Sequence, residues 1–476
     1  MILTAFLMSL SLIFCIIYQE KLINYLSFII PIALLLLIGY LFNIRKAKSK
    51  RLLAREGLVI AGTTWLIIAF FGCMPFMISK EIPNFFDAFF EMVSGFTTTG
   101  ASILTGEEME ALSHSLKFWR SFSHWIGGMG VLVFILAIIP ESKEGSAVHI
   151  LRAESPGPQV GRLVSKMQAT SRILYLIYLV LTIIQFLFLW IGPDNKMNWF
   201  NSLIYTLGTA GTGGFSIHAA GVGYFSIYSQ YVIAIFMIIF GINFSLFYLV
   251  LIGNVKEAFK NEELRWYLTI VTISVLIICF TIYNIYDNVE ETFRHSLFQV
   301  ATIISTSGYS TVDFEQWPTI AKCVLLLLMI SGGCAGSTAG GIKVARIGLL
   351  TKSSISKVKN TVNPRQVTTT TFDGKSVNEN MIYNIQKYFV VYCMVFVVCT
   401  FLISVDGFDL ITNITSSLTC LNNVGPGLGN IVGPAGSFGD FSNFSKFILS
   451  IEMIAGRLEL FPLLVLFSPK TWKRKI

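Results

Sequence analysis

The sequence predicts an all-α integral membrane protein with ten transmembrane helices and four re-entrant pore half-helices, arranged as four pseudo-repeats of helix, pore loop and helix around one pore. Three observations support this fold class. Apolar residues make up 54% of the 476 residues and charged residues only 13%, whereas soluble proteins are about 25% charged. Apolar stretches long enough to cross a bilayer recur along the chain. A pattern of 16 residues is found four times between these stretches.

Ten stretches are predicted to span the bilayer. The first lacks the basic start and small-residue cleavage site of a signal peptide, so we expect it to be retained. The eighth is interrupted by small residues at 331–341, and the tenth contains Glu452, Arg457 and Glu459. The predicted spans are 2–19, 22–44, 57–79, 119–140, 173–192, 226–252, 266–286, 320–350, 387–405 and 445–468.

Lysine and arginine gather in alternate connections between these spans. The segments 45–55, 143–172, 256–265, 343–387 and 470–475 hold 6, 5, 3, 8 and 4 basic residues, 26 of the chain's 35. Because basic residues mark the cytoplasmic side, we expect a multi-pass protein of the inner or plasma membrane with both termini in the cytoplasm. The net charge of +8 then reflects topology, and we expect no nucleic-acid partner.

The residue types that carry enzyme chemistry are scattered. Five histidines and eight cysteines show no metal-ligand spacing, and no nucleophile–base–acid arrangement or Walker motif is present. GPGLGNIVG (425–433) resembles a dinucleotide fingerprint only weakly, because no strand–helix–strand unit surrounds it. We therefore expect no enzymatic activity and no organic cofactor on this chain.

Four windows of 16 residues align without gaps and end on glycine. Position one is large and apolar in each window, and position fourteen is threonine or asparagine. The glycines are 114, 94 and 117 residues apart, a period that indicates a repeated architecture. The windows are FFDAFFEMVSGFTTTG (85–100), WFNSLIYTLGTAGTGG (199–214), FRHSLFQVATIISTSG (293–308) and LITNITSSLTCLNNVG (410–425). We expect two helices outside the repeats in 1–50 and repeats in 51–150, 151–255, 256–352 and 353–476.

Each window predicts a half-helix followed by a loop that lines a pore. Non-helical backbone at membrane depth is allowed only where it is buried in protein or lines water. The partially negative end of the half-helix favours a cation, and glycine lets carbonyl oxygens turn to the axis, where they can replace an ion's hydration shell. The alternative is four ordinary turn glycines in external loops. The candidate ion-binding residues are Thr98, Thr99, Gly100, Thr212, Gly213, Gly214, Thr306, Ser307, Gly308, Asn423, Val424 and Gly425.

The loops SGFTTTGAS, GTGGFSIHAAGVGYFS, STSGYSTVDF and NNVGPGLG resemble the four pore loops of TrkH-type potassium transporter subunits, in the Trk/Ktr/HKT superfamily of cation transporters. The resemblance extends to 153–178, 332–347 and 456–462 and covers nearly the whole chain. It implies uptake of potassium as the transported ion, a homodimer of two independent pores and a TrkA-like cytoplasmic nucleotide-binding regulatory subunit.

The same resemblance bears on ion selectivity. A serine at the first filter position is associated with sodium conduction in the superfamily, so Gly100 favours potassium. The pair Asn423 and Val424 departs from the threonine or serine of other copies. We expect this imperfect fourfold symmetry to let rubidium pass and some sodium leak.

The run SGGCAGSTAGG (331–341) is a candidate gate. Each glycine costs about 1 kcal/mol against alanine in a helix interior, so five glycines predict unwound backbone, and the resemblance implies a gating loop here. The alternative is a close-packing surface for a neighbouring helix. The candidate gate residues in and after this run are Gly332, Gly333, Gly336, Ser337, Thr338, Gly340, Gly341 and Lys343.

Arg457 is a second candidate gate. A charge deep in the membrane is costly and usually functional, and an arginine facing the pore would repel a passing cation. The alternative is a buried ion pair with Glu452, with Glu459 or with an acidic residue of another helix.

Two cytoplasmic features are candidates for contacts outside the bundle. Residues 367–377, VTTTTFDGKSV, predict two short strands around an Asp-Gly turn, either a dock for a regulatory subunit or a self-contained cap. The tail KTWKRKI is expected to touch lipid headgroups or the partner.

A secondary transporter that couples potassium to protons or sodium is the alternative function. Such folds use inverted repeats and broken helices near the midplane. Here all four copies keep one orientation, which favours a pore. A lipid-active membrane enzyme is a further alternative, but it would need clustered acids, bases or metal ligands.

Overall fold

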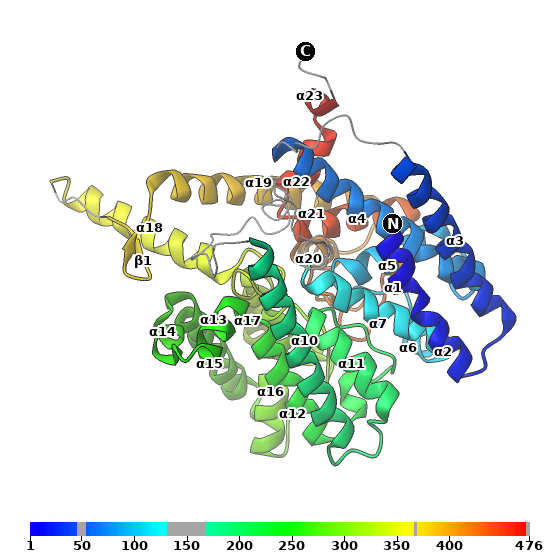
Figure 1. The fold of residues 1–476 in the computed structure, drawn as a ribbon. Coiled ribbons are helices and arrows are strands. Elements are labelled where there is room, and N and C mark those ends of the chain that lie inside the picture. The colour runs from blue at the N-terminus through cyan, green and yellow to red at the C-terminus, as the bar shows by residue number, and fades with distance from the viewer. Residues whose placement is uncertain (45–53, 131–166, 366–368, 473–476) are drawn as a thin grey trace.

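The computed structural model describes residues 1–44, 54–130, 167–365 and 369–472. These residues are helical apart from connecting segments and one two-stranded hairpin (Figure 1). The second part of the predicted span 119–140 and the end of the tail KTWKRKI lie outside the described residues.

Three N-terminal helices lie against the first part of the bundle. The first predicted span is divided into α1 (Ile2–Ser9) and α2 (Ser11–Ile17), and the second is α3 (Leu22–Ile44). Helix α3 packs along α4 (Ala54–Ser79), and α2 packs against α7 (His114–Gly128).

Four short helices are each flanked by two further helices in the same chain order. They are 12, 13, 16 and 13 residues long and buried along most of their length, and we call them the inner helices. Helix α5 (Phe85–Phe96) lies between α4 and α7, and α11 (Trp199–Gly211) between α10 (Met167–Ile191) and α12 (Ile227–Phe240). Helix α16 (Val289–Ile304) lies between α15 (Glu262–Ile282) and α17 (Thr319–Ser331). Helix α20 (Leu410–Asn422) lies between α19 (Glu379–Ile403) and α21 (Asn443–Arg457).

Three of the inner helices begin after a residue whose side chain caps the helix N-terminus. Asn84, Asn198 and Asp409 each accept a hydrogen bond from a backbone N–H of the first turn through the side chain, a cap that contributes about 1 kcal/mol. Three inner helices therefore start at the first residue of their 16-residue window. Helix α16 starts four residues earlier, at Val289.

The predicted span 226–252 is bent, because the chain turns by 92° between α12 and α13 (Phe244–Leu251), and the two helices together are long and apolar enough to count as one span. Gly241 follows the last residue of α12 as its C-cap, and the Gly241 carbonyl oxygen accepts a hydrogen bond from Cys334 N. The side chain of Asn243 caps the new helix by accepting from Ser245 N. The bend therefore follows from a glycine end, an asparagine cap and a partner segment that satisfies the freed carbonyl.

The eighth predicted span is broken as expected, and the tenth is broken as well. Helix α17 ends at Ser331, and the chain resumes as α18 (Val344–Val362). Helix α21 ends at Arg457, and α22 (Phe461–Phe467) follows after Leu460, whose φ of 68° prevents a continuous helix. The remaining short helices are α6 (Gly106–Ala111), α14 (Val255–Lys260) and α23 (Pro469–Trp472), with 3-10 turns at Gly221–Tyr224, Phe314–Gln316, Ser404–Asp406 and Phe438–Asp440.

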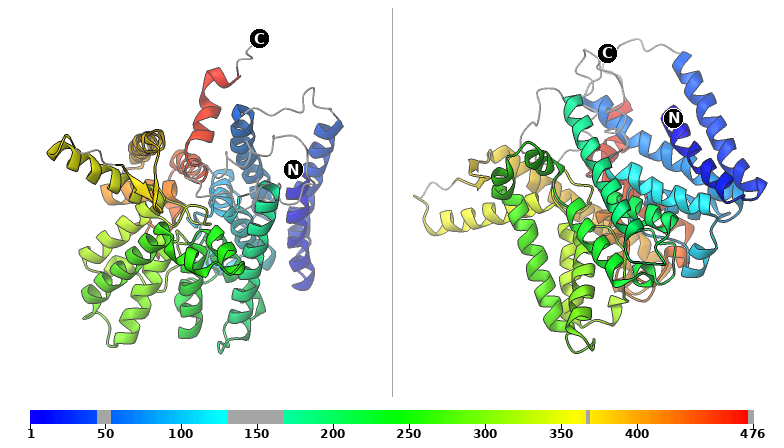
Figure 2. Two further views of the ribbon diagram at one scale, coloured as in Figure 1. Left: turned by 60° about the vertical axis from the view of Figure 1, so that its left-hand side comes forward. Right: turned by 60° about the horizontal axis from the view of Figure 1, so that its bottom comes forward.

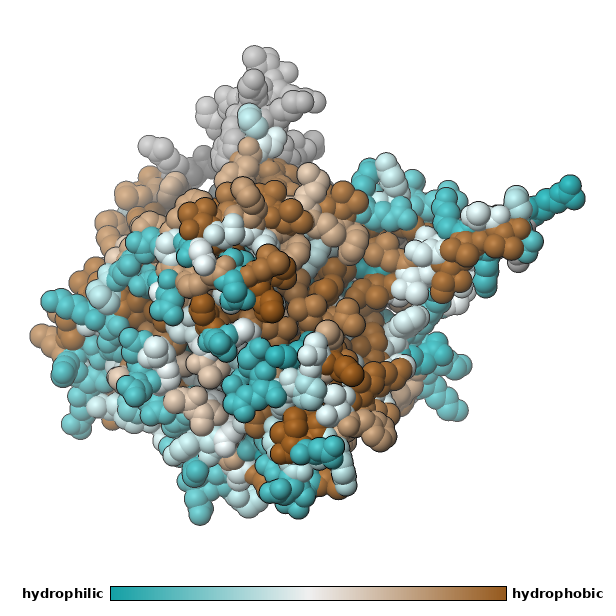
Figure 3. Space-filling model, turned by 180° about the vertical axis from the view of Figure 1, so that it is seen from behind, coloured by the Kyte–Doolittle hydropathy of each residue, from teal (hydrophilic) through white to brown (hydrophobic). Residues whose placement is uncertain are grey.

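The outer surface of the helices is apolar, as expected for a surface that faces lipid. Five helices among the described residues are long and apolar enough to cross a membrane, or six if the bent pair counts as one span. Large apolar side chains are exposed along α3, α10, α15 and α19, and apolar residues gather over the upper part of the back of the molecule (Figure 3). Exposed apolar patches of this extent mark a membrane-facing surface.

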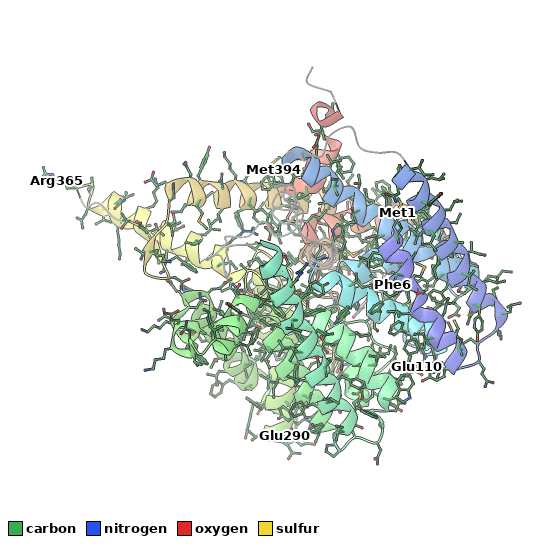
Figure 4. The ribbon with its side chains drawn as sticks, viewed as in Figure 1. Met1, Phe6, Glu110, Glu290, Arg365 and Met394 are labelled. Carbon is green, nitrogen blue, oxygen red and sulfur yellow. The ribbon has the colours of Figure 1, made fainter. Side chains whose placement is uncertain are left out.

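Helix α18 projects from the bundle, with α19 running back beside it (Figures 1 and 2). Figure 4 places Arg365 at the outer end of this arm and Glu290 at the bottom of the bundle. The predicted hairpin is confirmed: β1 (Thr371–Phe372) pairs antiparallel with β2 (Lys375–Ser376) around Asp373 and Gly374. The hairpin is docked, because the Asp373 carboxylate accepts from the backbone N–H of Glu262 at 2.6 Å, at the start of α15.

Candidate functional site

The four windows end in one repeated backbone shape. Position fourteen lies in the left-handed region in every copy, with φ of 57°, 56°, 56° and 55° at Thr98, Thr212, Thr306 and Asn423. Position sixteen also has positive φ in every copy. These glycines are Gly100 at 79°, Gly214 at 79°, Gly308 at 83° and Gly425 at 105°. We call the segments 97–102, 211–216, 305–310 and 422–427 the ring loops.

The turn into each ring loop is stabilised by the same pair of backbone hydrogen bonds. In the first copy, Thr99 N donates to Ser94 O at 2.9 Å and Thr98 N donates to Gly95 O at 3.2 Å. The equivalent pairs occur in the other copies, with lengths between 2.8 and 3.3 Å. This is the Schellman arrangement that ends many helices, which usually has glycine at the left-handed position.

Threonine at the left-handed position is unusual and strained. For a residue with a Cβ this conformation costs roughly 1–2 kcal/mol, and a β-branched residue there is a genuine outlier. Asparagine tolerates it better, so Asn423 is the least strained copy. Strain of this kind persists where a side chain has a role that glycine could not fill. Threonine and asparagine at position fourteen each supply a side-chain oxygen, which glycine could not.

The ring loops close on one another in chain order. A Cβ added to Gly100 would overlap the carbonyl oxygen of Gly213 in the second loop. The same overlap joins Gly214 to the Ser307 carbonyl oxygen and Gly308 to that of Val424. In the fourth loop a Cβ on Gly425 would lie 2.8 Å from the Thr99 carbonyl oxygen of the first loop. The four loops that contain the predicted residues therefore contact one another in a closed ring.

Among the twelve predicted residues, two side-chain oxygens are buried without a hydrogen-bond partner in the described part of the chain, Thr98 Oγ1 and Asn423 Oδ1. The amide nitrogen of Asn423 donates to Thr99 Oγ1 at 2.9 Å and to the Met453 carbonyl oxygen at 3.0 Å. Because buried polar groups are normally satisfied, two unpartnered acceptors leave room for a cation or a water.

The candidate gate run contacts the ring directly. Gly340 N donates to Thr306 Oγ1 at 2.6 Å, and a Cβ on Gly340 would overlap the Asn422 carbonyl oxygen. Thr338 Oγ1 donates to the carbonyl oxygen of Phe240, the last residue of α12. Glu263 Oε1 accepts from Ala335 N at 2.6 Å. The run is therefore an ordered loop, held between the ring, the bend after α12 and the start of α15.

The ends of this loop are constrained as well. Lys343 has a φ of 82°, and its Nζ donates to the Ala339 carbonyl oxygen. Gly332 and Gly341 also have positive φ and lie against each other, because a Cβ on Gly332 would be 2.9 Å from Gly341 Cα. Gly333, Gly336 and Ser337 complete the loop, with Gly336 O accepting from Phe244 N at 3.1 Å.

Arg457 reaches across from the end of α21 to two other repeats. Its guanidinium donates to the carbonyl oxygens of Gly127 and Gly128, each at 2.5 Å, and to that of Thr338 at 2.8 Å. Gly127 and Gly128 end α7, where a helix carries partial negative charge. Carbonyl groups thus hold the arginine against both the gate loop and the first repeat.

The carboxylates predicted as alternative partners of Arg457 have hydrogen bonds elsewhere. Glu459 forms an ion pair with Arg346 of α18. Glu452 accepts from the Ser417 hydroxyl at 2.6 Å.

Sequence reasoning missed a charged pair behind the ring, Glu91 and Arg120, and a buried histidine, His124. Arg120 and His124 lie at the start of the predicted span 119–140. The available signal was a glutamate in the first window and a lone arginine in a predicted span, each costly in a membrane unless paired.

The site and its setting define a class of protein: a polytopic membrane protein organised around one closed ring of four like loops. The chain belongs to the TrkH family of cation transport proteins, whose family profile matches residues 25–474.

The chain matches known proteins along almost its whole length. The chain is 37% identical to the Trk system potassium uptake protein TrkH of Salmonella typhimurium over 438 residues, 90% of this chain and 88% of that protein. It is 31% identical to TrkG of Escherichia coli, covering 96% and 93% of the two chains. The crystal structure of the potassium transporter TrkH from Vibrio parahaemolyticus superposes with a TM-score of 0.86 at 30% identity, covering 99% and 97%.

Proposed function

We propose that this chain takes up potassium through a pore on the axis of the ring loops. The observation that carries the proposal is the closed cycle of contacts from Gly100 to Gly425 and back to Thr99. Four equivalent turns can present rings of backbone carbonyls to one ion, as in potassium filters. The relatives named as potassium uptake proteins support potassium as the ion.

The proposed membrane arrangement follows the four repeats. The inner helices act as re-entrant pore half-helices, ten helices span the inner or plasma membrane, and both termini are cytoplasmic. The repeats occupy 51–150, 151–255, 256–352 and 353–476, with 1–50 outside them. Thr98 Oγ1 and Asn423 Oδ1, buried without partners, supply acceptors for the ion below the carbonyl rings.

The proposed selectivity is for potassium over sodium, but not complete. All four position-sixteen residues are glycine, which leaves the backbone carbonyls as the ligands. Asn423 and Val424 break the fourfold chemistry, and the Asn423 amide is tied to Thr99 Oγ1. Rubidium therefore passes with potassium, and some sodium leaks.

The gate in this proposal has two parts that contact each other beneath the ring. The loop 332–343 touches the ring through Gly340 and Thr306. Arg457 binds the same loop at the Thr338 carbonyl oxygen and places a fixed positive charge below the filter. Movement of the loop would release the arginine and remove the repulsion between its charge and a passing cation.

The proposed assembly is a homodimer regulated by a TrkA-like cytoplasmic nucleotide-binding subunit. The hairpin 371–376 is a suitable dock, because Asp373 couples it to the start of α15. Glu263 of α15 in turn binds the gate loop at Ala335. Displacement of the hairpin by a bound subunit would therefore be transmitted through the start of α15 to the gate loop.

Ion flux into proteoliposomes that contain only this chain tests the proposal. Gradients of potassium, rubidium, sodium and lithium are compared with no coupling ion present. Potassium and rubidium influx well above that of sodium and lithium is the expected result. Influx that requires an added proton or sodium gradient would instead establish an ion-coupled secondary transporter.

A further inference from the structure

A buried ion pair lies behind the first ring loop. Glu91, at position seven of its window on α5, accepts from Arg120 of α7 through Oε1, at 2.9 Å from Nε and 2.6 Å from Nη2. The side chains are 0% and 1% exposed. Every other ion pair among the described residues has at least one partner more than 10% exposed.

The pair contacts two ring loops: Glu91 binds the first, and Arg120 binds both the first, at the Ser102 hydroxyl, and the second. Glu91 accepts from the Ser102 hydroxyl at 3.0 Å and from Ile103 N at 3.0 Å, where the chain leaves the first loop. Arg120 donates through Nη1 to the Ser216 carbonyl oxygen of the second loop at 3.1 Å. Its guanidinium also lies 4.0 Å from the centre of the Phe215 ring, a cation–π contact. The pair therefore joins the first loop to the second.

His124, one helical turn after Arg120, reinforces the same junction. Its Nδ1 donates to the Gly95 carbonyl oxygen at 2.7 Å, and its Nε2 accepts from Phe215 N at 3.3 Å. A Cβ on Gly213 would overlap the imidazole ring. One face of α7 thus sets the distance between α5 and the backbone of the second loop.

The other junctions lack a fully buried ion pair among the described residues, although Asp87 pairs with Lys446 between the fourth and first repeats and Arg294 Nη1 donates to Gln230 Oε1 between the second and third. The Tyr309 hydroxyl lies 3.5 Å from the Tyr205 carbonyl oxygen between the second and third repeats. Glu315 accepts from Gly429 N between the third and fourth repeats, and its side chain is 23% exposed. Phe438 N donates to the Ser102 carbonyl oxygen between the fourth and first. Within the described residues, a fully buried ion pair occurs at the first junction alone.

We propose that Glu91 and Arg120 are positioning residues that set ion discrimination by fixing the first two ring loops relative to each other. A buried ion pair adds little net stability over apolar residues of the same volume. The presence of the pair is therefore better explained by the way it positions the two loops than by a gain in stability. Carbonyl ligands discriminate between ions through their spacing and rigidity. The inference rests on the proposed function.

The test compares rubidium and sodium influx into proteoliposomes of the full chain. Glu91→Gln/Arg120→Gln removes both charges together, so no unpaired charge stays buried. The expected result is a fall of about tenfold in the rubidium-to-sodium influx ratio, which corresponds to about 1.4 kcal/mol. Arg120→Lys keeps the charge but not the fork of donors, and it should lower the ratio to a smaller extent, about threefold.

The matched control is the ion pair of Asp87 and Lys446, at 2.6 Å, which fastens the same helix α5 to α21. Asp87→Asn/Lys446→Gln should lower the thermal unfolding temperature and leave the ratio unchanged. An unchanged ratio in the folded Glu91/Arg120 double variant overturns the inference. If that variant does not fold, an unchanged ratio in Arg120→Lys overturns it. Absence of rubidium preference in the unmodified protein would contradict the proposed function instead.

Discussion

The backbone N–H of Gly340 donates to the side-chain oxygen of Thr306 at 2.6 Å. One residue belongs to the candidate gate and the other to the ring, so the two parts of the site share a hydrogen bond. Thr306 is held in a strained left-handed conformation, with φ of 56°. Release of the loop would therefore alter the ring at a position where energy is stored.

Thr306→Val should raise basal rubidium influx about fivefold. The substitution keeps the shape but leaves Gly340 N without its acceptor, which costs about 1–3 kcal/mol and favours displacement of the loop. Thr306→Ser keeps the acceptor and should behave as the unmodified protein. Thr302→Val is the control, because the Thr302 hydroxyl is buried without a partner in the described structure. Equal influx in Thr306→Val and the unmodified protein would show that this bond does not restrain the gate.

A shortened gate loop should raise basal influx strongly. Deletion of Gly336, Ser337 and Thr338 removes the Thr338 carbonyl oxygen that Arg457 binds and the Thr338 hydroxyl bond to Phe240. Influx per folded protein, checked by gel filtration, is the measurement. Unchanged influx after the deletion would mean that the loop is a packing surface, the alternative reading of its small residues.

Arg457→Ala should raise influx about tenfold. A nearby unit positive charge raises the energy of a passing cation, and removal of about 1.4 kcal/mol of this repulsion is tenfold in rate. Arg346→Ala, which breaks the ion pair with Glu459, is a control for the loss of a neighbouring buried arginine. A folded Arg457→Ala protein that conducts less than the unmodified chain would assign Arg457 a structural role.

Gly100→Ser should lower the rubidium-to-sodium influx ratio by about tenfold or more, because its Cβ would displace the Gly213 carbonyl oxygen and the spacing of the carbonyls sets the selectivity. Gly407→Ala is the control, because it introduces backbone strain at a positive φ without a clash. Gly407 has a φ of 76° and no atom within 4 Å of an added Cβ. The control should lose about 1 kcal/mol of stability and keep its ion ratio. A similar ratio in both variants would contradict a ring in which these glycines face neighbouring carbonyls.

The four windows were readable from the sequence because each is a local property of about 16 residues. Asn84, Asn198 and Asp409 cap helices through bonds to their own neighbours in the chain, whatever the tertiary structure. The four position-fourteen residues adopt the same turn because each preceding helix ends in the same way. The loop at 331–341 and the hairpin at Asp373 were predicted for the same reason, since glycine runs and Asp-Gly turns act on neighbouring residues.

Tertiary structure decided which distant groups meet. Arg457 binds Gly127, 330 residues away in the chain, and Arg120 joins Glu91 to Ser216 behind the ring. The bend after Gly241 exists because Cys334 supplies a hydrogen bond from another repeat. Hydropathy and local propensity contain no information on such partners, because a buried charge or a freed carbonyl is satisfied only by what packing brings to it.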